Sequence, residues 1–530
     1  MLFGVFPKRK ILIISLNLIL VVLFCVIFFF ANSLPEICLY EDEADYVYVV
    51  RKGFIANYMD SGTLPFTQFL KLGFSAITSQ KSKTELSRII RSADDISVYR
   101  HWHGPLYFYY LVTGKWIHKN QDHLIRMYSL MVQLFCAITV FAGFLFLLGY
   151  SNSITTFFLT ALCVLGSTSL YFSTAILSTH GVFTLACIGC LFVLIKAVQS
   201  GKVMYYHISA GIMGVVFLSN EYAVLMMVTW VSSLLFAEMK RKVGFRKILR
   251  IFIVSMIIWL GVIFILWPAS LLKFSLIKSY MTQAYFMVFR GSAFSPMPVW
   301  KYWISRFSAL PFDMGISFSG LSLGLLILLR KRQYLFFPPV FYMTLVLLTT
   351  LRNQSLNPTY TVTFVVTGII TFGIALSTLP GLRSFYKTGL LSLMCILQIY
   401  YLTCKLFPEQ KNILSPKTEI IRFLESEQPR NLLSVRYMIP IIRHYYPSIK
   451  VDSFTAEIYS HDEGLADVKR SIESGPEYDG MIFHGQYLSQ YLEIIDDRYY
   501  FDPVSFGSEN GVESWTYLRL KPRKNETVQM

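Results

Sequence analysis

Eleven apolar runs, most of them long enough to cross a membrane as a helix, occupy the first 406 residues of this 530-residue chain. A spanning helix needs about 20 mostly apolar residues. The runs are Ile11–Ala31, Leu124–Leu148, Ile154–Phe172, His180–Ile195, Met204–Leu218, Tyr222–Phe236, Ile248–Trp267, Gly315–Leu329, Tyr334–Leu351, Tyr360–Leu379 and Gly389–Leu406. Only 15% of residues are charged, against about 25% in a soluble domain. The sequence therefore predicts a polytopic α-helical membrane protein and excludes an ordinary soluble enzyme.

The first run follows three basic residues, Lys8-Arg9-Lys10, and could be either a signal peptide or a retained span. At about 21 residues it is longer than the usual apolar core of a signal peptide, and the residues after it make a poor cleavage site. We therefore interpret Ile11–Ala31 as a retained span.

Basic residues predict the orientation, because Lys and Arg concentrate in cytoplasmic loops. If the aromatic stretch Pro105–Lys119 lies at the membrane surface, the predicted cytoplasmic segments hold 16 of the 48 Lys and Arg residues and one acid, Glu238. If this stretch spans instead, the basic run from Lys240 to Arg250 faces outward. We therefore predict about eleven spans, a cytoplasmic N-terminus and an extracytoplasmic C-terminus. The net charge of +16 then belongs to the cytoplasmic rim, which removes the main argument for a nucleic-acid partner.

Two domains are expected. Residues 1–406 form the transmembrane domain, whose first external loop, 32–123, carries helices at the membrane interface. Residues 407–530 are richer in charge and form a small extracytoplasmic α/β domain. Its expected helices are Thr418–Glu427 and Leu465–Ser474, and its expected strands are Asn431–Val435, Ser448–Phe454, Asp479–His484 and Ser514–Leu520.

An acidic cluster, Tyr40-Glu41-Asp42-Glu43-Ala44-Asp45-Tyr46, begins about eight residues after the first span. Such carboxylates can act as a general base or hold a divalent cation. They are equally compatible with a solvated helix N-terminus, where acids complement the helix dipole. Both interpretations remain open on composition alone.

A second cluster, Tyr99 to Tyr110, combines Arg100, His101 and His103 with a series of aromatic residues that includes Tyr107. Arg and His donate hydrogen bonds to phosphate oxygens, and aromatic rings pack against sugars or lipid headgroups. An aromatic belt at the membrane interface explains the same composition.

The order of these motifs resembles the GT-C glycosyltransferase superfamily, and in particular its protein O-mannosyltransferase and lipid A aminoarabinose transferase group. The resemblance rests on a span, then Asp42-Glu43-Ala44-x-Tyr46, then His103-Gly104-Pro105-Leu106-Tyr107, then Leu124-Ile125-Arg126 at the start of a long span. It covers roughly residues 11–150. Two departures stand out: relatives often have Pro-Pro in place of Gly104-Pro105, and Lys-Tyr in place of Glu221-Tyr222.

The resemblance implies that a sugar moves from a polyprenyl-phosphate donor to an acceptor outside the cytoplasm. Asp42 would be the general base of a single inverting displacement, and Glu43 would be the adjacent acid. Tyr46, Arg100, His103 and Tyr107 are the candidates for donor phosphate or sugar binding. Arg352 and Tyr360 join them, because relatives often have Arg or Tyr near the start of a late helix.

Glu221 is a candidate for acceptor or cation contact, since its charge is opposite to that of the Lys in relatives. Asp42 and Glu43 would favour Mg or Mn if a metal is used. The sequence does not identify the sugar, hexosyl or pentosyl, nor does it decide whether the acceptor is a glycolipid, a polysaccharide or a protein. A bacterial inner membrane is the expected location. A lipid or sugar transporter and a non-catalytic membrane scaffold are the competing functions.

Overall fold

The computed structural model describes residues 8–32, 46–47, 50, 71, 74–75, 79, 104–118, 122–149, 154–267, 299–331, 333–350, 361–379, 383–406, 416–435, 438–454, 461–496, 498–507 and 514–523. The chain divides into two compact units. The bundle unit comprises Met1–Ser33 and Val49–Pro408, and the C-terminal unit comprises Leu34–Tyr48 and Glu409–Met530.

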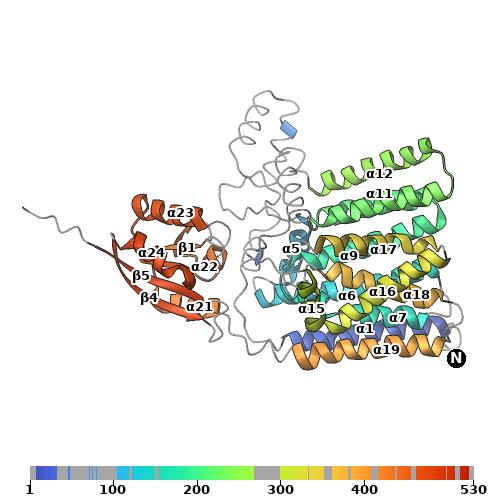
Figure 1. Ribbon diagram of the computed structural model, residues 1–530, viewed down its shortest axis with the longest axis horizontal. Coiled ribbons are helices and arrows are strands. Elements are labelled where there is room, and N and C mark those ends of the chain that lie inside the picture. The colour runs from blue at the N-terminus through green and yellow to red at the C-terminus, as the bar shows by residue number, and fades with distance from the viewer. Residues whose placement is uncertain are drawn as a thin grey trace, which may run out of the picture. The chain divides into compact units, whose positions relative to one another are not determined.

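The bundle unit is built from helices that run side by side (Figure 1). They are α1 (Lys8–Asn32), α5 (Leu106–His118), α6 (Asp122–Leu148), α7 (Ile154–Leu165), α8 (Thr168–Ala175), α9 (Thr179–Ser200), α10 (Val203–Phe217), α11 (Ala223–Lys240), α12 (Phe245–Leu266), α15 (Val299–Ala309), α16 (Pro311–Lys331), α17 (Phe337–Thr350), α18 (Val362–Thr378) and α19 (Ser384–Tyr401). Short η2 (Tyr334–Phe336) precedes α17, and η4 (Leu402–Leu406) follows α19.

Each of the eleven predicted apolar runs is a helix or a bent pair of helices in the structure. Among the described residues, six helices are long and apolar enough to cross a membrane, and a seventh candidate is the pair α7 and α8, bent by 52°. Four further apolar helices are shorter. The expected polytopic helical character is therefore confirmed, while the number of eleven spans stays a prediction.

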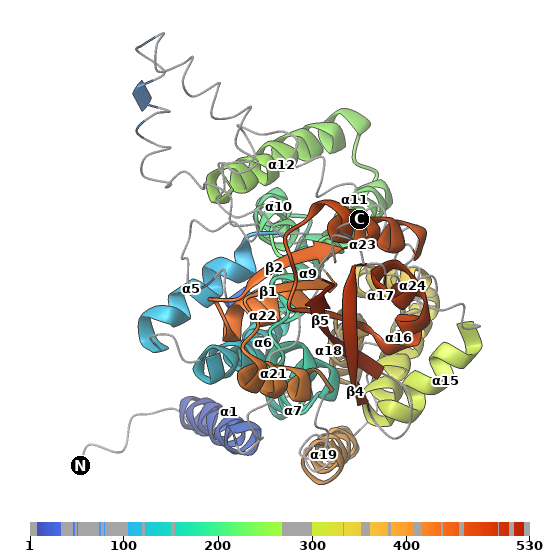
Figure 2. The ribbon, with the colours of Figure 1, turned by 90° about the vertical axis from the view of Figure 1, so that its left-hand side faces the viewer.

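Helix α5 lies across the end of the bundle and not along it (Figures 1 and 2). It has 13 residues and would be about 20 Å long, which is too short to cross a bilayer. Contacts with α6 and α9 hold it there. This arrangement agrees with the expectation that Pro105–Lys119 does not span.

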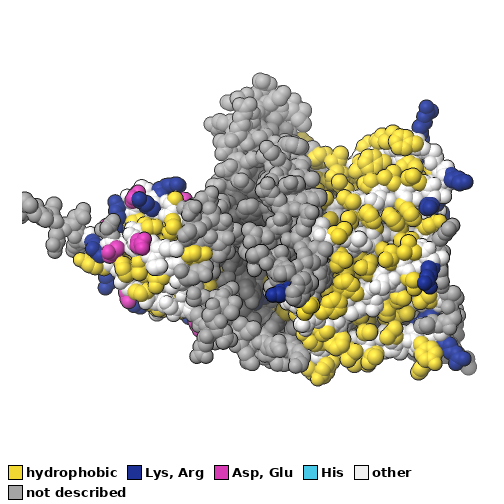
Figure 3. Space-filling view, in the orientation of Figure 1, with side chains coloured by type: hydrophobic (Ala, Val, Ile, Leu, Met, Phe, Trp, Pro, Cys, Tyr) yellow, Lys and Arg dark blue, Asp and Glu magenta, His cyan; other side chains and the backbone are white. Residues whose placement is uncertain are grey.

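The surface of the bundle unit separates by residue type (Figure 3). Hydrophobic side chains cover the sides of the helices, and Lys and Arg gather at the end that holds the start of α1. Glu238, the one acid expected there, is 3% exposed, forms an ion pair with Arg241 and accepts a 3.1 Å hydrogen bond from Tyr206. This end of the bundle therefore remains basic although it contains the carboxylate of Glu238.

The C-terminal unit is a five-stranded sheet with helices. Its elements are α21 (Pro416–Glu427), β1 (Asn431–Val435), α22 (Ile439–Tyr445), β2 (Lys450–Phe454), α23 (His461–Ser474), β3 (Gly480–His484), η6 (Gly485–Tyr487), α24 (Leu488–Ile495), β4 (Tyr499–Gly507) and β5 (Ser514–Pro522). The strand order is β2-β1-β3-β5-β4. Strand β1 is parallel to β2 and β3, whereas β5 is antiparallel to β3 and β4.

The four predicted strands and two predicted helices of this unit are all present, with small shifts at their ends. Four further elements, α22, η6, α24 and β4, were not expected from the sequence. Strand β4 contains Pro503, which lacks an N–H group and argues against an interior strand. The structure tolerates this proline because β4 is at the edge of the sheet, paired only with β5.

Candidate functional site

Three of the predicted site residues are described, and all three are buried. Tyr46 is 2% exposed, and Tyr107 and Glu221 are fully buried. Six others lie outside the described residues, namely Asp42, Glu43, Arg100, His103, Arg352 and Tyr360. The roles of these six stay predictions.

Helix α5 begins by docking on the loop that carries Glu221. The backbone N–H of Leu106 donates a 3.0 Å hydrogen bond to the carbonyl oxygen of Leu218. A Cβ atom at Gly104 would lie 2.1 Å from that same oxygen, so only glycine fits at this position. The departure from the Pro-Pro pattern of relatives therefore has a structural reason. It also brings the residues that follow His103 in the sequence against the loop at 218–222.

Asn220 holds this loop to the start of α9. Its Nδ2 atom donates a 2.8 Å hydrogen bond to Oγ1 of Thr179, and its Oδ1 atom accepts a 3.0 Å bond from the N–H of Tyr222. Asn220 and Thr179 are both buried. The backbone on each side of Glu221 is therefore fixed, and its carboxylate is held within the end of the bundle.

Tyr107 connects α5 to α6. Its hydroxyl group lies 3.1 Å from Oγ of Ser129, and both side chains are buried. Arg126, one turn before Ser129 on α6, is half-buried and interacts electrostatically with Tyr171 on α8. The motif residues Tyr107 and Arg126 thus come from two elements that pack together at one end of the bundle.

A buried carboxylate that sequence reasoning missed lies at the start of α16. Asp313 is 2% exposed, and its Oδ2 atom accepts hydrogen bonds from the N–H of Ser169 at 2.8 Å and from Oγ of Ser167 at 3.0 Å. Its Oδ1 atom accepts a 2.8 Å bond from Nε2 of Gln398. The first turn of α8 supplies the backbone donor, and the positive end of a helix dipole favours an anion there.

The predicted start of this helix explains why Asp313 was not among the predicted site residues. The predicted run began at Gly315 and placed Asp313 in a loop, whereas α16 begins at Pro311. An ionisable residue inside a spanning helix is a functional candidate by default, so the correct boundary would have drawn attention to it. Arg306, on the preceding α15, is also buried, at 2% exposed.

The polar groups around α5, the 218–222 loop and Asp313 all belong to one end of the bundle, the end crossed by α5 (Figures 1 and 2). In the described part of the chain, no three His, Cys, Asp or Glu side chains are grouped as a metal site would require. Asp42 and Glu43 fall outside that part, so the expectation of a Mg or Mn ion stays a prediction.

The fold of this chain is similar to those of ArnT, a lipid A aminoarabinose transferase, and of an archaeal oligosaccharyltransferase, which agrees with the resemblance of its motif order. No protein-family model and no curated protein matches the sequence. Two structures of ArnT from Cupriavidus metallidurans, one in the apo state and one bound to undecaprenyl phosphate, match with a TM-score of 0.58. Their identities are 11% and 10%, over 94% of this chain and 97% of theirs.

The apo oligosaccharyltransferase of Archaeoglobus fulgidus also matches, with a TM-score of 0.55 and 9% identity, over 96% of this chain and 76% of that one. At identities this low, the likeness concerns the fold. A fold of this kind does not determine the activity, which depends on the residues of the site.

Proposed function

We propose that this chain is an integral membrane glycosyltransferase that moves a sugar from a polyprenyl-phosphate carrier to an extracytoplasmic acceptor. The likeness to ArnT, one structure of which holds undecaprenyl phosphate, supports the class of donor. The observation that carries the proposal is the docking of Gly104 and Leu106 on Leu218. It brings the chain next to His103 together with the loop of Glu221, at a polar end of an otherwise apolar bundle.

The proposed chemistry is one displacement at the anomeric carbon. An acceptor hydroxyl group attacks that carbon and gives its proton to the carboxylate of Asp42, while the bond to the carrier phosphate breaks. The phosphate leaves as an anion, and the anomeric configuration inverts. Arg100, His103 and Arg352 carry donors suited to the phosphate oxygens, and Tyr360 is assigned to the same group by the sequence pattern.

The remaining candidates have supporting roles in this proposal. Glu43 neighbours the base, Glu221 meets the acceptor or a cation, and Tyr46 and Tyr107 are assigned to the donor phosphate or sugar. The hydrogen bond between the hydroxyl groups of Tyr107 and Ser129 supports a role for Tyr107 in positioning α5. We assign the active site to the extracytoplasmic side, with the N-terminus in the cytoplasm.

The decisive experiment compares Asp42→Asn with Asp45→Asn, each expressed in a deletion strain. Position 45 is the variable position of the Asp-Glu-Ala-x-Tyr pattern, so it provides a matched carboxylate. We expect Asp42→Asn to lower transfer by about 10²–10⁴-fold, as loss of a general base does, and Asp45→Asn to stay within about threefold. Transfer is measured by mass spectrometry of glycolipids, polysaccharides and glycoproteins from a deletion strain that expresses each variant.

Full transfer by Asp42→Asn would remove the assignment of the base. An unchanged glycan profile in the deletion strain, together with a changed transport phenotype, would favour a transporter instead.

A further inference from the structure

Helix α12 lies at the edge of the bundle and leaves much of its length uncovered (Figures 1 and 3). It packs mainly against α10 and also touches α11. Ile248, Ile251 and Ile263 are among its few buried side chains. Only 22% of its most apolar stretch is buried, against 78% for α9. The uncovered face of α12 is therefore a surface that the membrane has to meet.

Charge and hydrophobicity follow one another along this uncovered face. Arg246 and Arg250 are exposed in the first turns of α12. Ile253, Ile257 and Leu260 follow, with exposed fractions of 48%, 63% and 40%. The spacings of four, three, four and three residues place all five on one side of a helix. We call these five residues the α12 face.

The two arginines of the α12 face have no partner for their charge in the described part of the chain. Neither guanidinium forms a hydrogen bond or an ion pair there. The acid nearest to them in sequence, Glu238, is buried and pairs with Arg241. The sequence has no Asp or Glu between Glu238 and Asp313. The positive charge at the start of α12 thus remains available to an anion.

The turn before α12 adds further cations, and one of them is strained. Lys240, Lys242 and Lys247 are all exposed. Lys242 has a φ of 56°, in the left-handed region that favours glycine after a helix, and the N–H of Val243 donates a 3.0 Å hydrogen bond to the carbonyl oxygen of Glu238. A cation therefore stands where glycine would relieve strain, and local strain of this kind is typical of functional positions.

We propose that the α12 face binds one anionic phospholipid of the surrounding membrane. Arg246 and Arg250 are one helical turn apart, so both can donate to the same headgroup. Ile257 lies about 10 Å further along the axis than Arg250 and continues the apolar surface that an acyl chain needs. The unpaired positive charge selects an anionic headgroup, and the apolar continuation selects a lipid over a soluble anion.

This inference goes beyond the proposed sugar transfer. Helix α11 begins beside the 218–222 loop and ends at Lys240, so α12 begins at the opposite end of the bundle from α5. Lipid binding there requires neither donor nor acceptor. A failure of the proposed transfer therefore leaves the inference intact, and a failure of the inference leaves the proposed transfer intact.

The test measures lipid binding to the full-length protein in detergent by native mass spectrometry. The probes are anionic phosphatidylglycerol and phosphatidylcholine with the same acyl chains, whose choline group cancels the phosphate charge. We expect phosphatidylglycerol to bind at least about fivefold more tightly. The variant Arg246→Gln/Arg250→Gln should weaken phosphatidylglycerol binding about tenfold or more, because each basic residue near a lipid headgroup contributes about a factor of five.

The control variant, Lys202→Gln/Arg383→Gln, removes the same charge from two separate helix starts. Lys202 directly precedes α10, and Arg383 directly precedes α19. We expect phosphatidylglycerol binding to this control to stay within about twofold of the wild type, because single cations do not converge on one headgroup. All four substituted side chains are exposed, so both variants should fold, and thermal unfolding in detergent verifies this.

Four outcomes would overturn the inference. The first is equal binding of the two lipids, and the second is wild-type binding of phosphatidylglycerol by Arg246→Gln/Arg250→Gln. The third is an equal loss in the control variant, which would mean that total charge and not the α12 face attracts the lipid. The fourth is displacement of phosphatidylglycerol by inorganic phosphate, which would mean that the apolar residues of the face play no part.

Discussion

Gln398 on α19 donates a 2.8 Å hydrogen bond from Nε2 to Oδ1 of Asp313 on α16, across 85 residues of sequence. Both side chains are buried. The other donors to this carboxylate, Ser167 and Ser169, are also neutral. Among the described residues, no Lys, Arg or His forms an ion pair with Asp313. The carboxylate of Asp313 therefore connects α16 and α19 to the bend between α7 and α8. Because it is buried, loss of any one of its donors would leave part of it without a hydrogen bond.

We expect Asp313→Asn to destabilise the bundle by about 2–4 kcal/mol. The substitution replaces an acceptor oxygen by an NH₂ group, which then faces donors and leaves them unsatisfied in a buried place. The measurement is thermal unfolding in detergent. Ser319→Ala is the control, because Ser319 is on the same helix and, within the described part of the chain, its hydroxyl group donates only to the carbonyl oxygen of Gly315. An unchanged midpoint for Asp313→Asn would contradict the structural role of this network.

Gly104→Ala should detach the start of α5 from the 218–222 loop. The added methyl group would lie 2.1 Å from the carbonyl oxygen of Leu218, and a backbone atom cannot yield as a side chain can. We expect a loss of about 1–3 kcal/mol, as in overpacked cores, and at least a tenfold loss of transfer. Hydrogen exchange of peptides covering α5 reports the detachment.

Gly261→Ala provides the matched control for that variant. Gly261 is in α12, and among the described residues no atom outside the backbone of that helix lies within 4 Å of the place that an added methyl group would take. Alanine should therefore be tolerated there and should favour the helix by up to about 1 kcal/mol. Equal losses of activity in the two variants would mean that the close approach of Gly104 to Leu218 is unimportant.

Gln428→Gly should stabilise the C-terminal unit by about 0.5–1 kcal/mol. Gln428 directly follows α21 with a φ of 46°, in the left-handed region that disfavours residues with a Cβ atom. Its N–H donates a hydrogen bond to the carbonyl oxygen of Leu424. Glycine can adopt this conformation without strain. Ser426→Gly, two residues earlier within the helix, should have the opposite sign. Local stability is measured by hydrogen exchange of α21 and β1, and a destabilising Gln428→Gly would contradict the expectation.

Acid should weaken the C-terminal unit through Glu427. Hydrogen bonding to Arg519 holds the pKa of Glu427 below its ordinary value of 4.5. The folded state therefore binds the proton less readily than the unfolded state. The stabilisation is complete above the ordinary pKa and is lost as pH falls through the lowered one. Because both partners are partly exposed, we expect only about 0.5–1 kcal/mol.

The comparison variant for this pH dependence is Glu427→Gln. Unfolding by urea between pH 3 and pH 7 should show a smaller acid loss for Glu427→Gln than for the wild type, with the two curves converging at low pH. Parallel curves would indicate that the ion pair with Arg519 contributes no stability in solution.

Local sequence was sufficient wherever an element depends on its own residues. The apolar run predicted to end at Leu148 is α6, which ends at the same residue, and the strand predicted over Asn431–Val435 is β1. Hydropathy and β-propensity act over a few neighbouring positions, so they can be identified without knowledge of the partners. The order of the motifs around Asp42 and His103 also predicted a resemblance to the aminoarabinose transferase group, and the fold is similar to that of ArnT.

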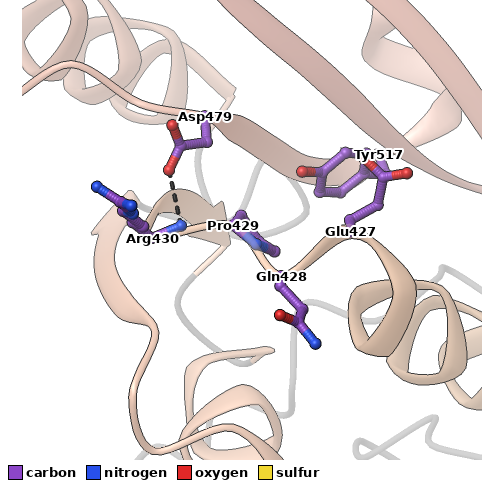
Figure 4. A pocket seen from close by; sticks show the side chains of 6 residues that line it. All are labelled: Glu427, Gln428, Pro429, Arg430, Asp479 and Tyr517. Carbon is purple, nitrogen blue, oxygen red and sulfur yellow. Dashed lines mark hydrogen bonds between the residues drawn. The ribbon is translucent and has the colours of Figure 1, made fainter.

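Tertiary structure alone decided how distant segments meet. Gly104 is a departure from a motif in the sequence, but in the structure it is the position that lets α5 touch the carbonyl oxygen of Leu218. In the sequence, Asp313 is a single acid near a predicted helix start. In the structure, its carboxylate accepts hydrogen bonds from Ser169 and Gln398. A polar pocket of the C-terminal unit (Figure 4) likewise depends on Asp479 and Tyr517 meeting the end of α21. The physical reason is common to all three: close contacts and buried hydrogen bonds depend on three-dimensional approach, whereas hydropathy records only how each residue partitions between water and an apolar environment.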